Sequence, residues 1–189
     1  MTLLITGLAL WWAVHLTPAF TPALKTSMVA RLGQSGWRGL FSLLTVAGIV
    51  LMVLGWRATA PAQVYAPLAP PKAAGAVMLV ALVLFFSARV PTDIKRWLRH
   101  PQLTGVLLWA LVHLAVNSEQ RSLLLFGGLG LWALVEIIAI NRRDGAWVKP
   151  APVGLLRSAV PLVIGAAAWA LLAWAHPWLA GVAVLPVMH

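Results

Sequence analysis

Six long apolar runs dominate this sequence and limit the chain to folds that a lipid bilayer accepts. Runs of roughly 15–20 apolar residues are typical of transmembrane helices, because such a helix crosses the hydrocarbon core with its backbone hydrogen bonds satisfied internally. We therefore predict an all-α polytopic membrane protein, a six-helix transmembrane bundle that forms a single domain over residues 1–189. The predicted helices cover about residues 3–21, 39–56, 74–90, 102–117, 121–140 and 158–176.

The composition supports the membrane class and excludes several functions. The chain is 61% hydrophobic and only 10% charged, whereas soluble domains carry roughly a quarter charged residues. It contains no cysteine, which excludes disulfides, thiolate-held iron–sulfur clusters and Cys-ligated zinc or haem. No Gly-rich phosphate loop, carboxylate pair or Ser-His-Asp set is present, so nucleotide-driven and hydrolytic chemistry lack support.

The basic residues are distributed unevenly between the loops and predict the orientation of the chain. The net charge of +10 lies in short loops, where Lys and Arg set topology and meet anionic headgroups. We therefore expect membrane lipid and no nucleic acid as a partner. The first, third and fifth loops hold eleven of the fourteen basic residues, which places these loops in the cytoplasm and both termini outside. The eleven are Lys25, Arg31, Arg38, Arg89, Lys95, Arg96, Arg99, Arg142, Arg143, Lys149 and Arg157.

Two segments of ten residues nearly repeat each other. The segments 7–16 and 105–114 share six of ten positions, including a glycine, a tryptophan and a histidine. They lie in the first and fourth predicted helices, which run in opposite directions, so the pair predicts a 3+3 inverted repeat. The other helix pairs show no convincing similarity. In each copy the histidine lies about 12 Å beyond the glycine along the helix axis, near the middle of the membrane.

The paired histidines, His15 and His113, are the first candidates for chemistry. An imidazole in hydrocarbon is costly without a partner, and two imidazoles in matched settings suggest one shared partner, a haem b iron. The alternative is a buried histidine bonded to a neighbouring carbonyl. Trp11 and Trp109 each lie four residues before a histidine and share its helix face, where they would pack on a porphyrin or simply in the bundle.

Three charged residues complete the candidate set. Arg96 and Arg99 precede the fourth helix and would bind the haem propionates, or else serve topology and lipid contact. Glu136 is the one acid well inside a span. It would accept the second imidazole N–H near His15 and so fix the ring, or else pair with a basic residue at the end of its helix, Arg142 or Arg143.

The remaining histidines are weaker candidates. His100 and His176 each precede a proline at a helix end, which favours an interfacial position over metal binding, and their roles stay open. His189 is the terminal residue and carries no prediction.

Four segments of the sequence together are typical of one known family. The most specific is the Arg-His-Pro…Trp…His block within Ile94–Leu114, with Asn117 soon after; the others are Ala13–Leu16, Leu125–Gly128 and His176–Gly181. In these segments the chain resembles the NnrU family. That family is named for a role around nitrite and nitric oxide reduction in denitrifying bacteria. The resemblance therefore implies a bacterial inner (cytoplasmic) membrane, with both termini periplasmic.

The plant and cyanobacterial zeta-carotene isomerases look like relatives of that family. They are membrane haem b proteins with two histidine ligands, and they convert a cis double bond to trans. Carried over to this sequence, the ligands fall on His15 and His113. A thiolate as an alternative ligand is impossible here, because no cysteine exists.

Three functions remain open at this point. The primary expectation is a haem b-binding, bis-His membrane protein of nitrogen-oxide metabolism, with nitric oxide or electrons handled at the iron. The second is a redox-gated cis–trans isomerase of a hydrophobic polyene such as a carotenoid. The third is a haem-free membrane scaffold for denitrification enzymes. If the protein is an enzyme, we expect a haem-dependent isomerase or a redox protein, so catalysis itself stays open.

Overall fold

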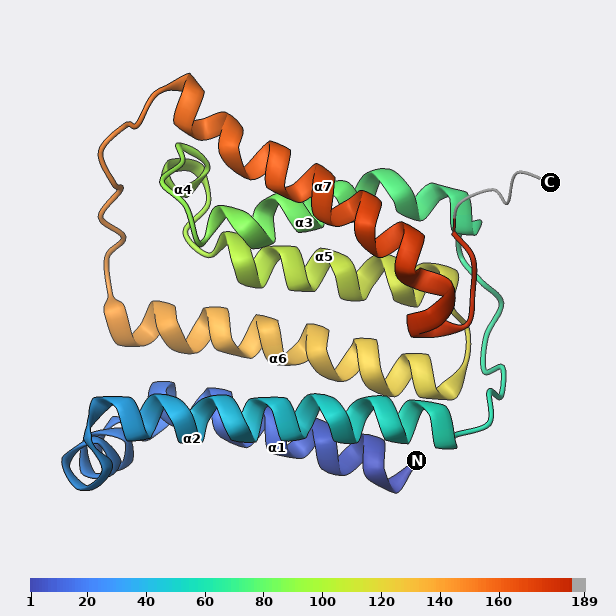
Figure 1. The fold of residues 1–189 in the computed structure, drawn as a ribbon, viewed down its shortest axis with the longest axis horizontal. Coiled ribbons are helices and arrows are strands. Elements are labelled where there is room, and N and C mark those ends of the chain that lie inside the picture. The colour runs from blue at the N-terminus through green and yellow to red at the C-terminus, as the bar shows by residue number, and fades with distance from the viewer. Residues whose placement is uncertain (185–189) are drawn as a thin grey trace. The chain divides into compact units, whose positions relative to one another are not determined.

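The structure is a computed structural model, and it describes residues 1–184. It is all-helical over these residues, and helices cover each of the six predicted ranges (Figure 1). The elements are α1 (Thr2–Phe20), α2 (Pro22–Ala58), the 3-10 turn η1 (Pro71–Ala73), α3 (Ala74–Ser87), α4 (Ile94–Trp97), α5 (Pro101–Val116), α6 (Gln120–Asp144) and α7 (Leu155–Ala180).

The helices differ in whether they are long enough to cross a membrane. Among the described residues, α1, α2, α6 and α7 are long and apolar enough to span. The apolar helices α3 and α5 have only 14 and 16 residues. The membrane class is confirmed, while the predicted number of six spanning helices is not.

The chain folds as two compact units that interleave along the sequence. The first comprises Met1–Ala66 and Ser118–Gly145, and the second comprises Pro67–Asn117 and Ala146–His189. A 3+3 repeat would divide the chain into two sequential halves, but here α6 joins the unit of α1 and α2. The inverted repeat is therefore not confirmed.

In the first unit, α1 packs along α2 and also against α6. Glycines permit the closest approach: a Cβ on Gly7 would lie 2.7 Å from the backbone nitrogen of Met52, and a Cβ on Gly55 would collide with the backbone of Leu4. Leu4 is fully buried at this contact. Because the glycines carry no side chain, the two helices approach closely and dispersion contacts hold the pair together.

At the end of this unit where α2 ends and α6 begins, Arg121 joins the elements. Its Nη1 donates to the carbonyl oxygens of Trp56 and Thr59 at 3.3 and 3.1 Å, its Nε donates to Glu119 at 2.7 Å, and its guanidinium lies 4.4 Å from the centre of the Trp56 ring. The carbonyls at a helix C-terminus lack partners within the helix, so the cation caps α2 and fixes the start of α6 beside it.

The predicted first loop is instead helical. The helix α2 begins at Pro22, a residue suited to the first turn, rather than near residue 39. Within α2, Gly33 adopts φ 72° and ψ 168°, which breaks the helix into two segments at one residue. Only glycine takes this backbone conformation readily. The basic side chains within the segment 22–38 therefore lie on helical turns before and after the kink at Gly33.

In the second unit, α3 packs against both α5 and α7. Gly105 on α5 allows the approach to α3, because a Cβ there would lie 2.9 Å from the backbone nitrogen of Phe85. Gly165 on α7 approaches Val83 on α3 in the same way. Small residues at helix contacts are typical of membrane bundles.

Asp93 fastens the short helix α4 to the start of α7 within this unit. Its carboxylate accepts the Val153 backbone N–H at 3.0 Å and the Ser158 hydroxyl at 3.2 Å, and its own backbone N–H donates to the Ser158 oxygen at 3.0 Å. The hydrogen bond from Val153 is the main reason that the pKa of Asp93 lies below its ordinary value. A carboxylate also suits the positive end of the α7 dipole.

Candidate functional site

The two repeat histidines make the same hydrogen bond. His15 Nδ1 lies 2.9 Å from the carbonyl oxygen of Trp11, and His113 Nδ1 lies 2.7 Å from that of Trp109. A carbonyl oxygen only accepts, so Nδ1 carries the proton in both neutral rings and the lone pair is on Nε2. The bond satisfies a structural histidine, and it is also the bond by which metal-ligating histidines are commonly oriented.

The glycine of each repeat copy has a matching role. Gly7 lies where α1 meets α2, and Gly105 lies where α5 meets α3. In each copy the histidine follows two turns later on a helix that is held against its neighbour at the glycine. The two repeat copies therefore have the same local structure: a glycine at a helix contact, then a tryptophan, then a histidine bonded to the tryptophan carbonyl. The 3+3 inverted repeat of whole helices is not confirmed.

Aromatic rings surround His15 in the first unit. Trp11 stacks on the imidazole with centroids 4.0 Å apart and an angle of 22°, and the edges of Trp132 and Phe41 approach it at 5.2 and 5.1 Å. Trp132 also lies 5.2 Å from Trp11. Three helices thus contribute one ring cluster, which we call the His15 aromatic cluster: Trp11, His15, Phe41 and Trp132.

The surroundings of His113 in the second unit are different. Trp109 lies 5.2 Å from the imidazole and is tilted by 49° rather than stacked. The carbonyl oxygen of His113 accepts from the backbone N–H and from the Nδ2 amide of Asn117, which ends α5. His113 is therefore in the last turn of its helix. The hydrogen bond from its side-chain amide gives Asn117 a structural role at the end of α5, just after the repeat segment.

Buried polar atoms without hydrogen bonds gather in the first unit. Trp11 Nε1, Trp132 Nε1 and Glu136 Oε2 are buried and have no partner among the described residues. Trp132 and Glu136 are four residues apart on α6 and share a face, and Trp132 touches both Trp11 and His15. Unpaired buried polar atoms are costly, so this region suits a ligand or water with polar atoms of its own.

Glu136 interacts electrostatically with Arg143 at the basic end of its helix, but the hydrogen bonds of this arginine go to another acid. Arg143 donates from Nε and Nη2 to the two carboxylate oxygens of Asp144, at 2.7 and 3.2 Å. The structure thus gives Arg143 another carboxylate, and it places Glu136 one turn beyond Trp132. The Nδ1 proton of His15 is donated to the Trp11 carbonyl, so acceptance of this N–H by Glu136 stays a prediction that requires the ring to change partner.

The predicted arginines lie far from His113 along α5. Arg96 is on α4, and Arg99 lies just before Pro101, where α5 begins. His113 follows Pro101 by twelve positions, or about 18 Å at the rise of an α-helix. Both arginines and His113 belong to the second unit, whereas His15, Trp11 and Glu136 belong to the first.

The remaining histidines and the aromatic partners of His15 differ in how well the sequence identified them. His176 Nδ1 lies 2.7 Å from the carbonyl oxygen of Val182 just past α7, which agrees with a position at a helix end. His189 lies outside the described residues.

Trp132 and Phe41 could not be selected from the sequence, because eleven tryptophans and five phenylalanines in apolar runs give no signal of which ones contact His15. The spacing of Trp132 to Glu136 was the one available hint.

Comparison with known proteins identifies the family. The family model NnrU, described as NnrU protein, matches residues 3–184. The chain therefore belongs to the NnrU family. No curated protein and no solved structure matches the chain. Among residues 1–184, no group of three or more His, Cys, Asp or Glu is arranged to hold a metal ion.

Proposed function

We propose that this NnrU-family protein binds one haem b in the membrane, with His15 and His113 as the two residues that would hold its iron. The observation that carries the proposal is the matched tautomer: each histidine gives its Nδ1 proton to the carbonyl four residues earlier and directs its lone pair through Nε2. A bis-histidine haem takes only two ligands from the protein, so two imidazoles are a sufficient donor set.

The residues around each histidine have definable roles in this proposal. The carbonyls of Trp11 and Trp109 hold the rings and raise their basicity as ligands. The indole rings of the same two residues offer flat surfaces for a porphyrin. Glu136, one turn from Trp132, would anchor a second polar group near His15. When bound, a haem b would supply one-electron chemistry and, if one histidine were released, a site for a diatomic gas.

Family membership favours nitrogen-oxide metabolism as the setting. In that setting the protein would pass electrons or take up nitric oxide at the iron. A second candidate, a redox-gated isomerase of a hydrophobic polyene, is favoured by one observation: the His15 aromatic cluster surrounds the histidine with rings from three helices, against which a conjugated chain would pack. A scaffold without haem is the third candidate.

A role for Arg96 and Arg99 at the haem propionates stays a separate prediction. Their distance from His113 along the α5 axis, about 18 Å, argues against propionate contacts for a haem ligated there. The prediction would be supported by a loss of haem affinity in Arg99→Gln.

Absorbance spectra of single histidine variants test the proposal. The purified protein should show a Soret band and, on reduction, the sharp visible bands of a low-spin haem. His15→Ala and His113→Ala should each shift or abolish these bands. His189→Ala is the control, because no role is predicted for this histidine, and it should leave the spectrum unchanged. Wild-type spectra in both single variants would refute the proposed ligands. Absence of any Soret band would leave the haem-free scaffold as the remaining candidate.

A further inference from the structure

An open pocket of about 410 Å³ in the second unit is lined by two cations and one aromatic ring, Arg96, Trp97 and Lys149. Arg96 and Trp97 come from α4, and Lys149 comes from the segment between α6 and α7. We call it the α4 pocket. None of the candidate haem residues except Arg96 belongs to it.

Arg96 lines this pocket and has one hydrogen-bond donor without an acceptor. Its Nε is buried and has no hydrogen-bond partner among the described residues. Asp93 acts on Arg96 electrostatically, but the oxygens of that carboxylate accept from Val153 and Ser158. A buried charged donor without a partner is costly, and an oxyanion would satisfy it with a strong charge-assisted hydrogen bond.

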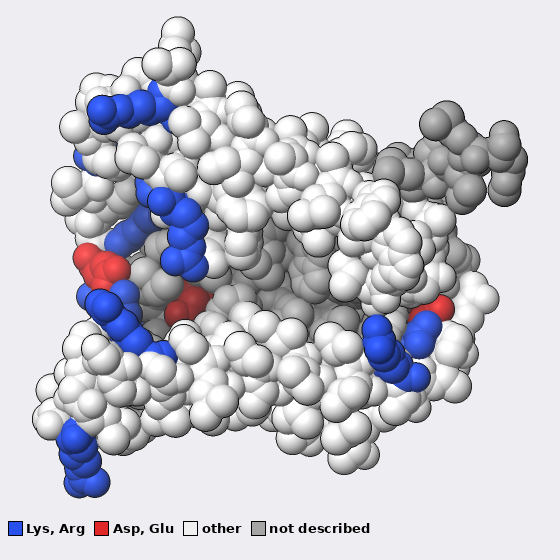
Figure 2. All heavy atoms as spheres, viewed as in Figure 1, with Lys and Arg blue, Asp and Glu red and all other residues white. Residues whose placement is uncertain are grey.

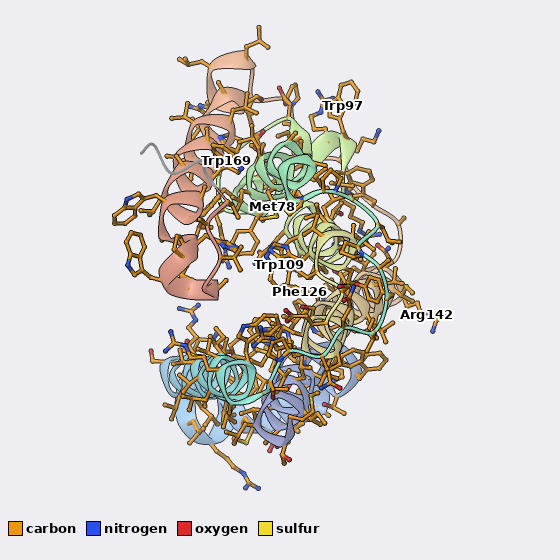
Figure 3. All side chains as sticks on the ribbon, turned by 90° about the vertical axis from the view of Figure 1, so that its right-hand side faces the viewer. Met78, Trp97, Trp109, Phe126, Arg142 and Trp169 are labelled. Carbon is orange, nitrogen blue, oxygen red and sulfur yellow. The ribbon has the colours of Figure 1, made fainter. Side chains whose placement is uncertain are left out.

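Trp97 and Lys149 indicate where such an anion would come from. Trp97 is 85% exposed and projects from α4 away from the neighbouring helices (Figure 3). Trp97 lies between the apolar helices α3 and α5, and tryptophan is typical of the headgroup region, where an amphipathic ring has both a polar and an apolar neighbourhood. Lys149 Nζ lies 5.5 Å from the centre of the Trp147 ring, so a second indole holds the second cation beside the pocket.

The charge balance around the pocket favours an anion. Lys and Arg side chains gather near helix ends in Figure 2, while the surface between them is almost entirely uncharged. Arg96 and Lys149 line the pocket, and none of the described residues that line it carries a carboxylate. Cations in this position attract the anionic lipids of a cytoplasmic leaflet.

We propose that the α4 pocket binds the phosphate of an anionic phospholipid headgroup. The guanidinium of Arg96 provides a planar donor fork suited to phosphate oxygens, and the ammonium of Lys149 adds a point charge. Trp97 lies against the glycerol and the first methylenes of the lipid. A free phosphate ion would use the same two cations but would gain nothing from Trp97, so the exposed indole favours the lipid.

The test uses the full-length protein in a mild detergent after its native lipid has been removed. Phosphatidylglycerol and phosphatidylcholine are titrated separately, and bound lipid is counted by native mass spectrometry. The wild type should retain phosphatidylglycerol in preference to phosphatidylcholine. Arg96→Gln and Lys149→Gln should each weaken binding of phosphatidylglycerol by roughly fivefold, since one basic residue near an anionic surface contributes about that factor. Arg31→Gln, an exposed basic residue of the first unit, is the control and should bind as the wild type does.

Further arms distinguish the source of the phosphate and guard against misfolding. Trp97→Ala should weaken the binding of phosphatidylglycerol. Inorganic phosphate at millimolar concentration should not displace the lipid; displacement would overturn the assignment to lipid. Lys149 is exposed, so Lys149→Gln should fold even if Arg96→Gln does not, and Arg96→Lys should keep part of the affinity. Unchanged binding of phosphatidylglycerol in Lys149→Gln, or equal retention of both lipids by the wild type, would overturn the proposal that the α4 pocket binds an anionic phospholipid.

Discussion

At the scale of single residues, the protein combines a histidine motif visible in the sequence with an aromatic environment that is not. The spacing Gly-x3-Trp-x3-His predicts that the tryptophan and the histidine share a helix face, and the structure adds that the Trp carbonyl accepts the Nδ1 proton. Phe41 and Trp132 come from other helices, so no local pattern announces their contact with His15.

Trp132 should be the most sensitive aromatic residue of the first unit. It is 5% exposed and touches both Trp11 and His15. Trp132→Ala should lower the free energy of unfolding by about 3–5 kcal/mol, the usual cost of removing a buried large aromatic side chain. Trp132→Phe should cost much less. Thermal unfolding in detergent measures both, with Trp178→Ala, a residue 63% exposed, as the control. A smaller loss for Trp132→Ala than for Trp178→Ala would contradict the packing described here.

At the scale of elements, the positions of the helices follow from the sequence better than their ends do. Apolar runs located every helix longer than one turn, because burial in lipid requires them. The start of α2 at Pro22 was missed, because residues 22–38 carry Lys and Arg and resemble a loop in hydropathy while remaining able to form a helix. The joining of α6 to α1 and α2 was also missed, because it depends on contacts between distant segments.

Glycines at the helix contacts should be intolerant of even one added methyl group. A Cβ on Gly7 or Gly105 would lie under 3.0 Å from backbone atoms of the neighbouring helix, so Gly7→Ala and Gly105→Ala should force the helices apart and lower the melting temperature. Gly127, on α6, is the control: its Cβ would meet nothing within 4 Å, and alanine there should stabilise the helix by up to about 1 kcal/mol. Equal melting temperatures for Gly7→Ala and Gly127→Ala would refute the close contact.

The Asp93 connection should give the second unit a measurable acid sensitivity. Its pKa is lowered in the folded protein below the ordinary value of 3.8. The carboxylate therefore contributes stability above about pH 4, and this contribution is lost as the pH falls through the lower folded pKa. Melting temperatures measured between pH 6 and pH 2 should fall more steeply for the wild type than for Asp93→Asn. Parallel curves would show that the connection contributes nothing to stability.

At the scale of the whole molecule, the chain is a helical membrane protein built of two interleaved units, each containing one copy of the glycine–tryptophan–histidine motif. The candidate ligands His15 and His113 were predicted from the sequence. What the sequence did not provide is their tautomer, because that depends on the carbonyl each ring meets. Nor did it show that Arg96 lines a pocket with Lys149, fifty-three positions later in the chain.

The orientation in the membrane is testable because the chain lacks cysteine, so each introduced thiol is unique. The basic loops predict that Ala66 faces the outside and Ala146 the cytoplasm, and both residues are exposed. A membrane-impermeant maleimide applied to intact cells with a permeable outer membrane should label Ala66→Cys and spare Ala146→Cys. The reverse pattern would invert the predicted topology.

The most direct test of the bis-histidine site combines the haem content with the spin state of the iron. The protein is purified from cells supplied with haem, the haem is quantified as its pyridine complex, and the oxidised sample is examined by electron paramagnetic resonance. Ligation by His15 and His113 predicts one haem b per chain and a low-spin ferric signal, which is lost in either alanine variant. A high-spin signal in the wild type, or a protein that takes up no haem, would contradict it.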